Sequence, residues 1–209
     1  MGEPPKVDAY EQERTFTAIG RFFVSVAWMQ LSIRTSIDQL TQPLSGTAYV
    51  YSRILSEMTL GSLTDVFFNS KDLWLDAPAC PEEQVSDIRE AMKVVERRIR
   101  DLISVRNRFA HDIWFVGFGN DADQMDATRF TERVGSNSKL STTRHTPEEI
   151  NGYAYEAWVL SNLMSRLQMA IGGHIALSQS IEWDGSDIHP KTGTLPPWPH
   201  AEQARGRAG

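Results

Sequence analysis

The sequence predicts a mainly α-helical fold, an up-and-down bundle of four to five helices with a small β-hairpin or flap inserted before the last long helix. Two observations support this prediction. Apolar residues recur every three or four positions over long segments, which is the spacing that forms one face of a helix. Prolines and glycines gather between those segments, where they favour turns over regular structure.

The first helix is expected from about Tyr10 to Leu40. Gln30 occupies one position of its apolar row, so a polar side chain is expected within an apolar seam. The other members of the row are Phe16, Ile19, Phe23, Val26, Ile33, Ile37 and Leu40. A row of this kind predicts that one side of the helix packs against the rest of the protein.

Two further helices are expected before the middle of the chain. A turn-forming segment at 43–46 precedes the second helix, which runs from about Thr47 to Asn69. A loop follows at 76–81. The proline that ends this loop and the two glutamates after it are typical of a helix start, which predicts a third helix that continues to about His111.

The segment between the third helix and the last one has a different character. Short β-leaning runs within 113–146 are separated by glycine-containing turns, which predicts the hairpin or flap. The last long helix begins at Thr146, which with Glu149 fits a capping box that has a proline at the first helical position. Its apolar pattern is interrupted at 172–173 and resumes to about Ile181.

These limits divide the chain into one helical domain and two tails. The helical domain covers 10–182, with the insertion inside it, and the N-terminal tail covers 1–9. The C-terminal tail, 183–209, is rich in proline and is expected to be extended rather than helical.

Composition and charge narrow the classes of protein that fit. A single cysteine, Cys80, excludes an internal disulfide and a cysteine-based zinc site and suits a reducing cytosol. The most apolar run, 22–29, is far shorter than the roughly 20 residues of a membrane span. No signal peptide is evident at the N-terminus, so a cytoplasmic protein that does not engage a membrane is expected. The net charge of -6 argues against a general nucleic-acid coat, although it allows a local basic site.

The most informative segment is Arg106-Asn107-Arg108-Phe109-Ala110-His111, at the end of the third helix. The apolar row of this helix continues in steps of three and four when Arg106 is counted as a member. A guanidinium in such a row needs an anionic or polar partner, because it cannot lose its proton. His111 follows five residues later and carries the side chain best suited to proton transfer near neutral pH. Alternatively, Arg106 pairs with a core acid and His111 caps the helix. The apolar members of the row are Val85, Ile88, Met92, Val95, Ile99, Leu102, Phe109 and Ile113.

This segment resembles the motif of the HEPN superfamily, named for higher eukaryotes and prokaryotes nucleotide-binding. The family motif is an arginine, four to six residues and a histidine, often with a polar residue after the arginine. Arg106 and His111 match it with four residues between them, and Asn107 matches the polar position. In helix order the resemblance extends over about 10–181, whereas its specific part is these six residues.

The resemblance implies a metal-independent endoribonuclease that needs no cofactor and cleaves single-stranded RNA at a composite site of a homodimer, in a bacterial toxin or phage-defence setting. His111 would act as base or acid, and Arg106 would hold the charge that grows on the phosphate oxygens. Asn107 lies four residues before His111 and would orient the imidazole. Toxins of one subgroup carry a tyrosine soon after the histidine, which their antitoxin modifies. Here the next tyrosine is Tyr153, so that mode of neutralisation is not expected.

Two other functions stay open at this point. Some HEPN proteins are inactive and serve as dimerisation or binding modules, so this chain could sense or regulate a partner effector or antitoxin. Outside the resemblance, the chain could be a helical scaffold without a ligand.

A polar stripe on the third helix bears on the substrate. Together with Arg108, the basic members of this stripe could guide a phosphate backbone toward the motif. Equally, they could form a solvated face that pairs with nearby acids. Trp114 could stack on a base or cover the end of the bundle. Gln30 could bond to the Arg106 region, satisfy a backbone group or lie at a subunit contact. The members of the stripe are Lys93, Arg97, Arg100, Ser104, Asn107 and His111.

Overall fold

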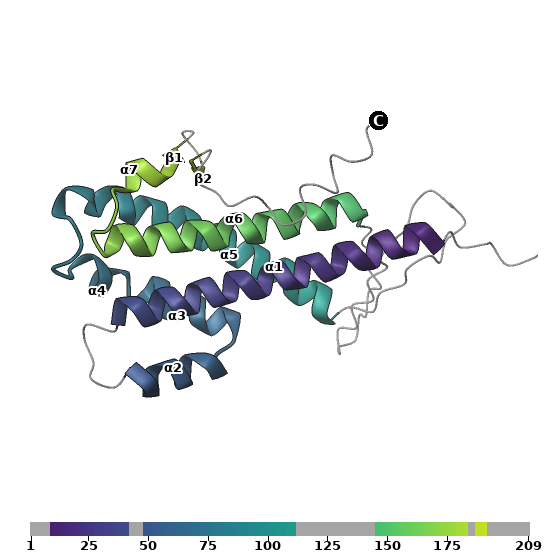
Figure 1. The fold of residues 1–209 in the computed structure, drawn as a ribbon, viewed down its shortest axis with the longest axis horizontal. Coiled ribbons are helices and arrows are strands. Elements are labelled where there is room, and N and C mark those ends of the chain that lie inside the picture. Colours follow the sequence, from purple (N-terminus) through teal and green to yellow (C-terminus); the bar gives the residue numbers. More distant parts are fainter. Residues whose placement is uncertain (1–8, 42–47, 112–144, 184–186, 192–209) are drawn as a thin grey trace, which may run out of the picture. The chain divides into compact units, whose positions relative to one another are not determined.

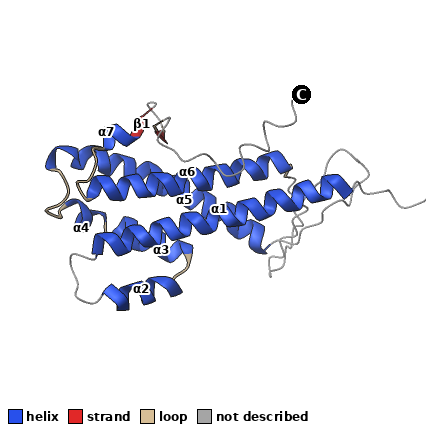
Figure 2. Ribbon diagram, viewed as in Figure 1, coloured by secondary structure: helices blue, strands red, loops and turns tan. Residues whose placement is uncertain are grey.

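A computed structural model defines a mainly helical fold (Figures 1 and 2). The residues that it describes are 9–41, 48–111, 145–183 and 187–191. Within them lie seven α-helices, a 3₁₀ turn and a two-stranded antiparallel sheet. The mainly α prediction is therefore confirmed, whereas the predicted number of four to five helices is too low.

Three of the helices are long, and the others are short. The long ones are α1 (Ala9–Thr41), α5 (Val85–His111) and α6 (Pro147–Ile171). The short ones are α2 (Ala48–Glu57), α3 (Leu60–Asn69), α4 (Lys71–Leu75) and α7 (Leu177–Ser180). The strands are β1 (Ile181–Trp183) and β2 (Ile188–Pro190).

The chain divides into two compact units. Unit 1 comprises Met1–Val26 and Ser104–Tyr155, and unit 2 comprises Ala27–Ile103 and Glu156–Gly209. Each long helix contributes one part to either unit. In unit 2 the parts of α1, α5 and α6 run alongside one another, with α5 antiparallel to the other two (Figure 1).

The apolar row expected on the first helix is displaced by one residue over its N-terminal half. Phe22 and Met29 are fully buried, whereas Phe16 is 59% exposed. The inward side of α1 consists of Thr15, Ala18, Phe22, Ser25, Val26, Met29, Ile33, Ser36 and Ile37. The expectation failed because α1 is apolar on two sides, so the three-four spacing alone selects more than one row.

The second predicted helix is two helices. The helix is interrupted at Thr59, whose extended backbone makes it the N-cap of α3 and whose hydroxyl oxygen accepts a hydrogen bond from the Ser62 amide at 3.2 Å. Trp74, in the unpredicted helix α4, anchors this part of unit 2 because its buried indole donates a hydrogen bond to the Phe67 carbonyl at 2.9 Å.

The starts of the later helices follow the sequence signals closely. The acids after Pro81 form a 3₁₀ turn, Glu82–Gln84, directly before α5. Thr146 and Glu149 make the reciprocal bonds of the expected capping box, at 3.1 and 3.2 Å. These bonds satisfy two backbone amides that a helix start otherwise leaves without partners.

Helix α6 ends at Ile171 in a Schellman motif, where the glycine pair was expected to interrupt it. The amide of His174 donates to the Met169 carbonyl at 2.9 Å, and that of Gly173 donates to the Ala170 carbonyl at 3.0 Å. Gly173 has a φ of 68°, which disfavours a residue with a side chain.

The chain after α7 is extended, as the proline-rich composition suggested, but it forms a hairpin that was not predicted. Glu182 pairs with His189 and Trp183 with Ile188 across the two strands. Ile188 is fully buried, so the start of the expected tail belongs to the core of unit 2. The expected insertion at 113–146 lies outside the described residues except for its last two positions, as do residues 1–8 and most of the C-terminal tail.

By length and composition alone, α1 from Gln12 to Thr41 could cross a membrane, which the short apolar run in the sequence did not suggest. Among the described helices it is the single one with this property. One third of its most apolar window (33%) is buried inside the protein.

Substitution of two glycines by alanine should change the free energy of unfolding in opposite directions, because Gly173 lies in a tight turn and Gly152 lies in an open helical position. A Cβ at Gly173 would lie 2.6 Å from the Ala79 carbonyl oxygen, whereas a Cβ at Gly152 in α6 would meet no atom within 4 Å. We expect Gly173→Ala to lower the free energy of unfolding by more than about 1 kcal/mol. Gly152→Ala should raise it by about 0.5–1 kcal/mol through helix propensity. Urea denaturation of both variants checks this, and equal effects would contradict the turn described at Gly173.

Candidate functional site

Arg106 does not belong to the row of buried side chains on α5. The row passes from Leu102 to Phe109 through Val105, in steps of three and four, and Arg106 is partly buried on its flank. The expected place of Arg106 within the apolar row is therefore wrong, because Val105 fills it. The buried members of this side are Ile88, Ala91, Met92, Val95, Ile99, Leu102, Val105 and Phe109.

The guanidinium that does interrupt the row is that of Arg98. It lies three residues after Val95 and four before Leu102, and its side chain is only 12% exposed. The three-four spacing that suggested Arg106 as a member of the apolar row fits Arg98 as well. Sequence reasoning missed it because Ile99, the next residue, also continues the row.

Arg98 is held by two acids from the C-terminal part of unit 2. Its Nε and Nη2 donate to the two carboxylate oxygens of Glu156, at 2.7 and 2.8 Å. Its Nη1 donates to Asp187 Oδ1 at 3.0 Å and to the Ile188 carbonyl oxygen at 2.6 Å. The bidentate contact uses the planar fork of donors that only arginine offers.

The electrostatics of this cluster explain why Arg98 can be buried. Burial by itself lowers the pKa of Arg98, but its hydrogen bonds and charge interactions with Glu156 and Asp187 outweigh burial, and the pKa is raised. The pairing thus compensates the loss of hydration. We conclude that Arg98 has a structural role, since its donors are used within the protein.

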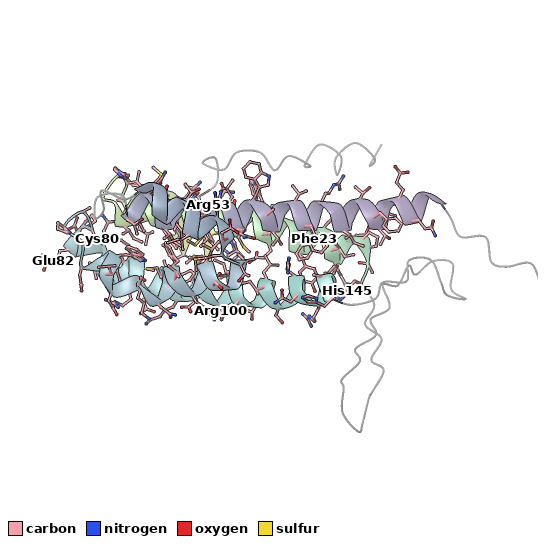
Figure 3. All side chains as sticks on the ribbon, turned by 90° about the horizontal axis from the view of Figure 1, so that it is seen from below. Phe23, Arg53, Cys80, Glu82, Arg100 and His145 are labelled. Atoms are coloured by element: carbon pink, nitrogen blue, oxygen red, sulfur yellow. The ribbon has the colours of Figure 1, made fainter. Side chains whose placement is uncertain are left out.

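Aromatic side chains hold the end of α5 within unit 1. Phe109 is buried, and its ring centroid lies 5.1 Å from that of Phe22 and 6.1 Å from that of Tyr153. The imidazole of His145, labelled in Figure 3, lies 5.2 Å from the same ring. These contacts fix the position of the motif helix through its apolar member.

The polar members of the motif lie on the outside of this aromatic cluster. Asn107, Arg108 and His111 are exposed, and His111 is the last residue of α5. Five residues at about 100° each rotate the chain by one turn and about 140°, so Arg106 and His111 project from different sides of the helix. One copy of the motif therefore does not direct both side chains to the same point.

Asn107 links to the arginine of the motif. Its Oδ1 accepts a hydrogen bond from Arg106 Nη1 at 3.2 Å. Asn107 and His111 are four residues apart and share a face of α5, as expected. Within the described residues, the amide oxygen of Asn107 contacts the guanidinium rather than the imidazole, so the structure lends no support to Asn107 as the group that orients the ring.

Lys93 and Arg100, two basic members of the polar stripe on α5, form ion pairs with nearby acids. Lys93 pairs with Glu90 at 2.6 Å. Arg100, which projects from α5 in Figure 3, pairs with Glu96 at 2.8 Å and Asp65 of α3 at 3.0 Å. The hydrogen bonds to Glu96 and Asp65 raise the pKa of Arg100. This end of the stripe thus behaves as a solvated face paired with acids.

The remaining sequence candidates lie as follows. Arg97 and Ser104 are exposed on α5. Gln30 donates from Nε2 to the Met58 carbonyl at 3.3 Å, so it satisfies a backbone group at the break between α2 and α3. Trp114 lies outside the described residues. Among the described residues no three His, Cys, Asp or Glu side chains form a cluster that could hold a metal ion.

Comparisons with known proteins identify no relative of this chain. No family model, no curated protein and no solved structure matches it. The likeness to the HEPN motif therefore depends on the six residues from Arg106 to His111 and on their position at the end of a long helix.

The two arginines of α5 should differ sharply in their effect on stability. Arg98→Met keeps much of the side-chain volume but leaves Glu156 and Asp187 without their cation. We expect it to lower the free energy of unfolding by about 3 kcal/mol, the low end of the range for broken buried pairs, because both acids are about one-third exposed. Arg106→Met is the matched control and should change it by no more than about 0.5 kcal/mol. Denaturant unfolding checks both, and equal losses would refute the assignment of roles.

Proposed function

We propose that this protein is a metal-independent endoribonuclease of the HEPN type, which cleaves single-stranded RNA at a site shared by two copies of the chain in a toxin or phage-defence setting. The observation that carries the proposal is the position of the motif at the end of α5, where Asn107 and His111 are exposed and the partly buried Arg106 bonds to Asn107. Polar groups held on a rigid helix end, with an aromatic cluster beneath them, suit a preorganised site.

The chemistry follows from the residue types. A neutral His111 takes the proton of a ribose 2′-hydroxyl, and the 2′-oxygen attacks the adjacent phosphorus. The bond from phosphorus to the 5′-oxygen breaks, and an imidazolium gives a proton to that leaving oxygen. The products are a 2′,3′-cyclic phosphate and a 5′-hydroxyl. Arg106 stabilises the charge on the non-bridging oxygens with two parallel hydrogen bonds.

The divergence of Arg106 and His111 around α5 favours a shared site. Because the two side chains project from sides about 140° apart, one phosphate is reached more readily by groups from two facing helices. Two histidines, one from each copy, would then act as base and acid. The hydrogen bond from Arg106 to Asn107 limits the rotamers of the guanidinium before RNA binds.

Cleavage in the presence of a chelator is the first test. The protein, incubated with a mixed-sequence single-stranded RNA and excess EDTA, should produce fragments that end in a 2′,3′-cyclic phosphate, detected by mass spectrometry. Activity that disappears with EDTA and returns with Mg²⁺ would refute the metal-independent chemistry. If no RNA is cleaved in vitro or in cells, the motif instead belongs to a binding module that regulates an effector.

The second test separates the roles of the motif residues. His111→Ala should lower the cleavage rate by about 10²–10⁴-fold, because it removes the proton-transfer group. Arg106→Lys keeps the charge but loses the bidentate contact, and we expect a loss of about 10²-fold. Arg108→Lys is the matched control and should stay within about threefold, since steering needs only charge. Equal effects of the two lysine variants would contradict the role of Arg106. Unchanged melting temperatures would show that the variants stay folded.

A further inference from the structure

An open groove with a volume of about 700 Å³ lies between α1 and α6, entirely within unit 2. The two helices run side by side there (Figure 1). Its apolar lining consists of Trp28 and Leu31 of α1 and Met169 of α6, which are 60%, 38% and 38% exposed. Large apolar residues that are exposed together mark a contact surface, and tryptophan is frequent at the energetic centre of such contacts.

The rest of the groove is polar, but no acid, lysine or arginine is among the described residues that line it. Thr35 and Gln39 of α1 and Gln168 of α6 contribute hydroxyl and amide groups, which can donate hydrogen bonds. The groove therefore suits an uncharged, partly apolar ligand that offers hydrogen-bond acceptors, rather than an ionic one.

The sequence contains such a segment directly after Lys191, the last described residue. Residues 192–199 read Thr-Gly-Thr-Leu-Pro-Pro-Trp-Pro and carry no charge. Proline has a fixed φ and no amide hydrogen, so three prolines in four positions favour the extended polyproline conformation and present carbonyl acceptors without donors. Segments of this kind bind in aromatic-lined grooves, because they lose little conformational entropy on binding.

The described chain ends close to the α6 wall of the groove. The amide of Lys191 donates to the Ser180 carbonyl oxygen at 2.9 Å, and Arg166 Nη1 of α6 donates to the same oxygen at 3.0 Å. Ser165, the residue before Arg166, lines the groove. Successive residues of a helix are about 100° apart, so the end of the hairpin and the groove lie on adjoining sides of α6.

The length of the segment agrees with this placement. The seven residues from Lys191 to Trp198 reach at most about 23 Å, which exceeds the 10–12 Å or so across a helix with its side chains. The groove follows α1 from Trp28 to Gln39, about 17 Å. Residues 195–199 span about 16 Å as a polyproline helix, so they fill the groove along its length.

We propose that the groove between α1 and α6 binds a proline-rich segment, and that residues 192–199 of the same chain occupy it. In this arrangement Trp198 packs against Trp28 and Met169, and the proline carbonyls accept hydrogen bonds from the hydroxyl and amide groups of the groove. The short tether holds the segment at an effective concentration on the order of millimolar, so it excludes similar segments of other proteins. The proposal depends on unit 2 and does not require that the protein cleave RNA.

A peptide competition assay tests the occupancy in the full-length chain. The probe is a fluorescein-labelled peptide of residues 192–200, and its fluorescence anisotropy reports binding. Trp198→Ser removes the largest apolar side chain of the tethered segment and should leave the groove open. We expect this variant to bind the probe at least about tenfold more tightly than the wild type, because the tethered segment no longer competes.

Two glutamate substitutions on α1 locate the binding site. In the Trp198→Ser background, Trp28→Glu should lower the affinity for the probe by about 30-fold or more, as for loss of an interface hot spot. Phe16→Glu is the matched control, because Phe16 is 59% exposed on the same helix but does not line the groove. It should change the affinity by no more than about twofold. Circular dichroism should show the same helix content in every variant.

Three outcomes of this assay would overturn the proposal. They are equal probe binding by the wild type and Trp198→Ser, no binding by either at about 1 mM protein, and equal effects of the two glutamate variants.

Fluorine NMR examines Trp28 without a probe peptide. Protein labelled with 5-fluorotryptophan gives a resonance for each indole, and Trp28→Phe identifies that of Trp28. Trp198→Ser should shift this resonance and increase its change between H₂O and D₂O, because the indole of Trp28 becomes more exposed. Trp183→Ser, at an exposed position of β1 (49%), is the control and should leave the resonance unchanged. A Trp28 resonance that does not respond to Trp198→Ser would refute the occupancy.

Dilution distinguishes the chain's own segment from that of another molecule. The Trp28 resonance should be the same at about 20 and 200 µM, because an intrachain contact does not depend on concentration. A resonance that moves with concentration would assign the segment to a neighbouring molecule and overturn the proposal. Neither the groove nor the segment includes the motif at Arg106–His111, so RNA cleavage by the same variants tests the proposed function separately.

Discussion

The largely buried guanidinium of Arg98 connects three segments of unit 2. Arg98 cannot lose its proton, so its place in the apolar row of α5 requires that anions be brought to it. Glu156 is supplied by α6, and Asp187 is supplied by the segment after β1. The bonds from Arg98 to Asp187 and to the Ile188 carbonyl oxygen join the β1–β2 hairpin to α5. One charge thus connects three segments that are distant in the sequence.

The same helix carries the structural arginine Arg98 and, further along, Arg106 of the proposed catalytic motif. Arg98 has all its strong partners inside the protein, whereas Arg106 bonds to Asn107 on the surface. The two arginines are only about two helical turns apart. Arg98 lies in the part of α5 that belongs to unit 2, where ion pairs hold the helix, and Arg106 lies in the part that belongs to unit 1, where Phe109 and its neighbouring rings hold it. An aromatic anchor leaves the polar groups around it available for a ligand.

Helix α1 is apolar on more than the side that it buries. Phe22, Met29 and Ile33 on its inward side are fully buried, whereas Phe16, Val24 and Trp28 are more than half exposed. The three-four spacing of apolar residues therefore does not by itself identify the side that packs against the protein.

Local signals in the sequence were sufficient for the helical class, the capping box at Thr146, an interruption of the last long helix at Gly172 and Gly173, and the position of the motif at the end of α5. These features depend on residues within a few positions of one another, so hydrogen-bonding chemistry and backbone restrictions determine them. The inward side of α1, the role of Arg98 and the C-terminal hairpin were decided only by tertiary structure. Two apolar rows on α1 satisfy the same spacing, and the row that is buried depends on which neighbours pack against it. The acids that neutralise Arg98 are 58 and 89 residues away, a distance over which no local pattern carries information.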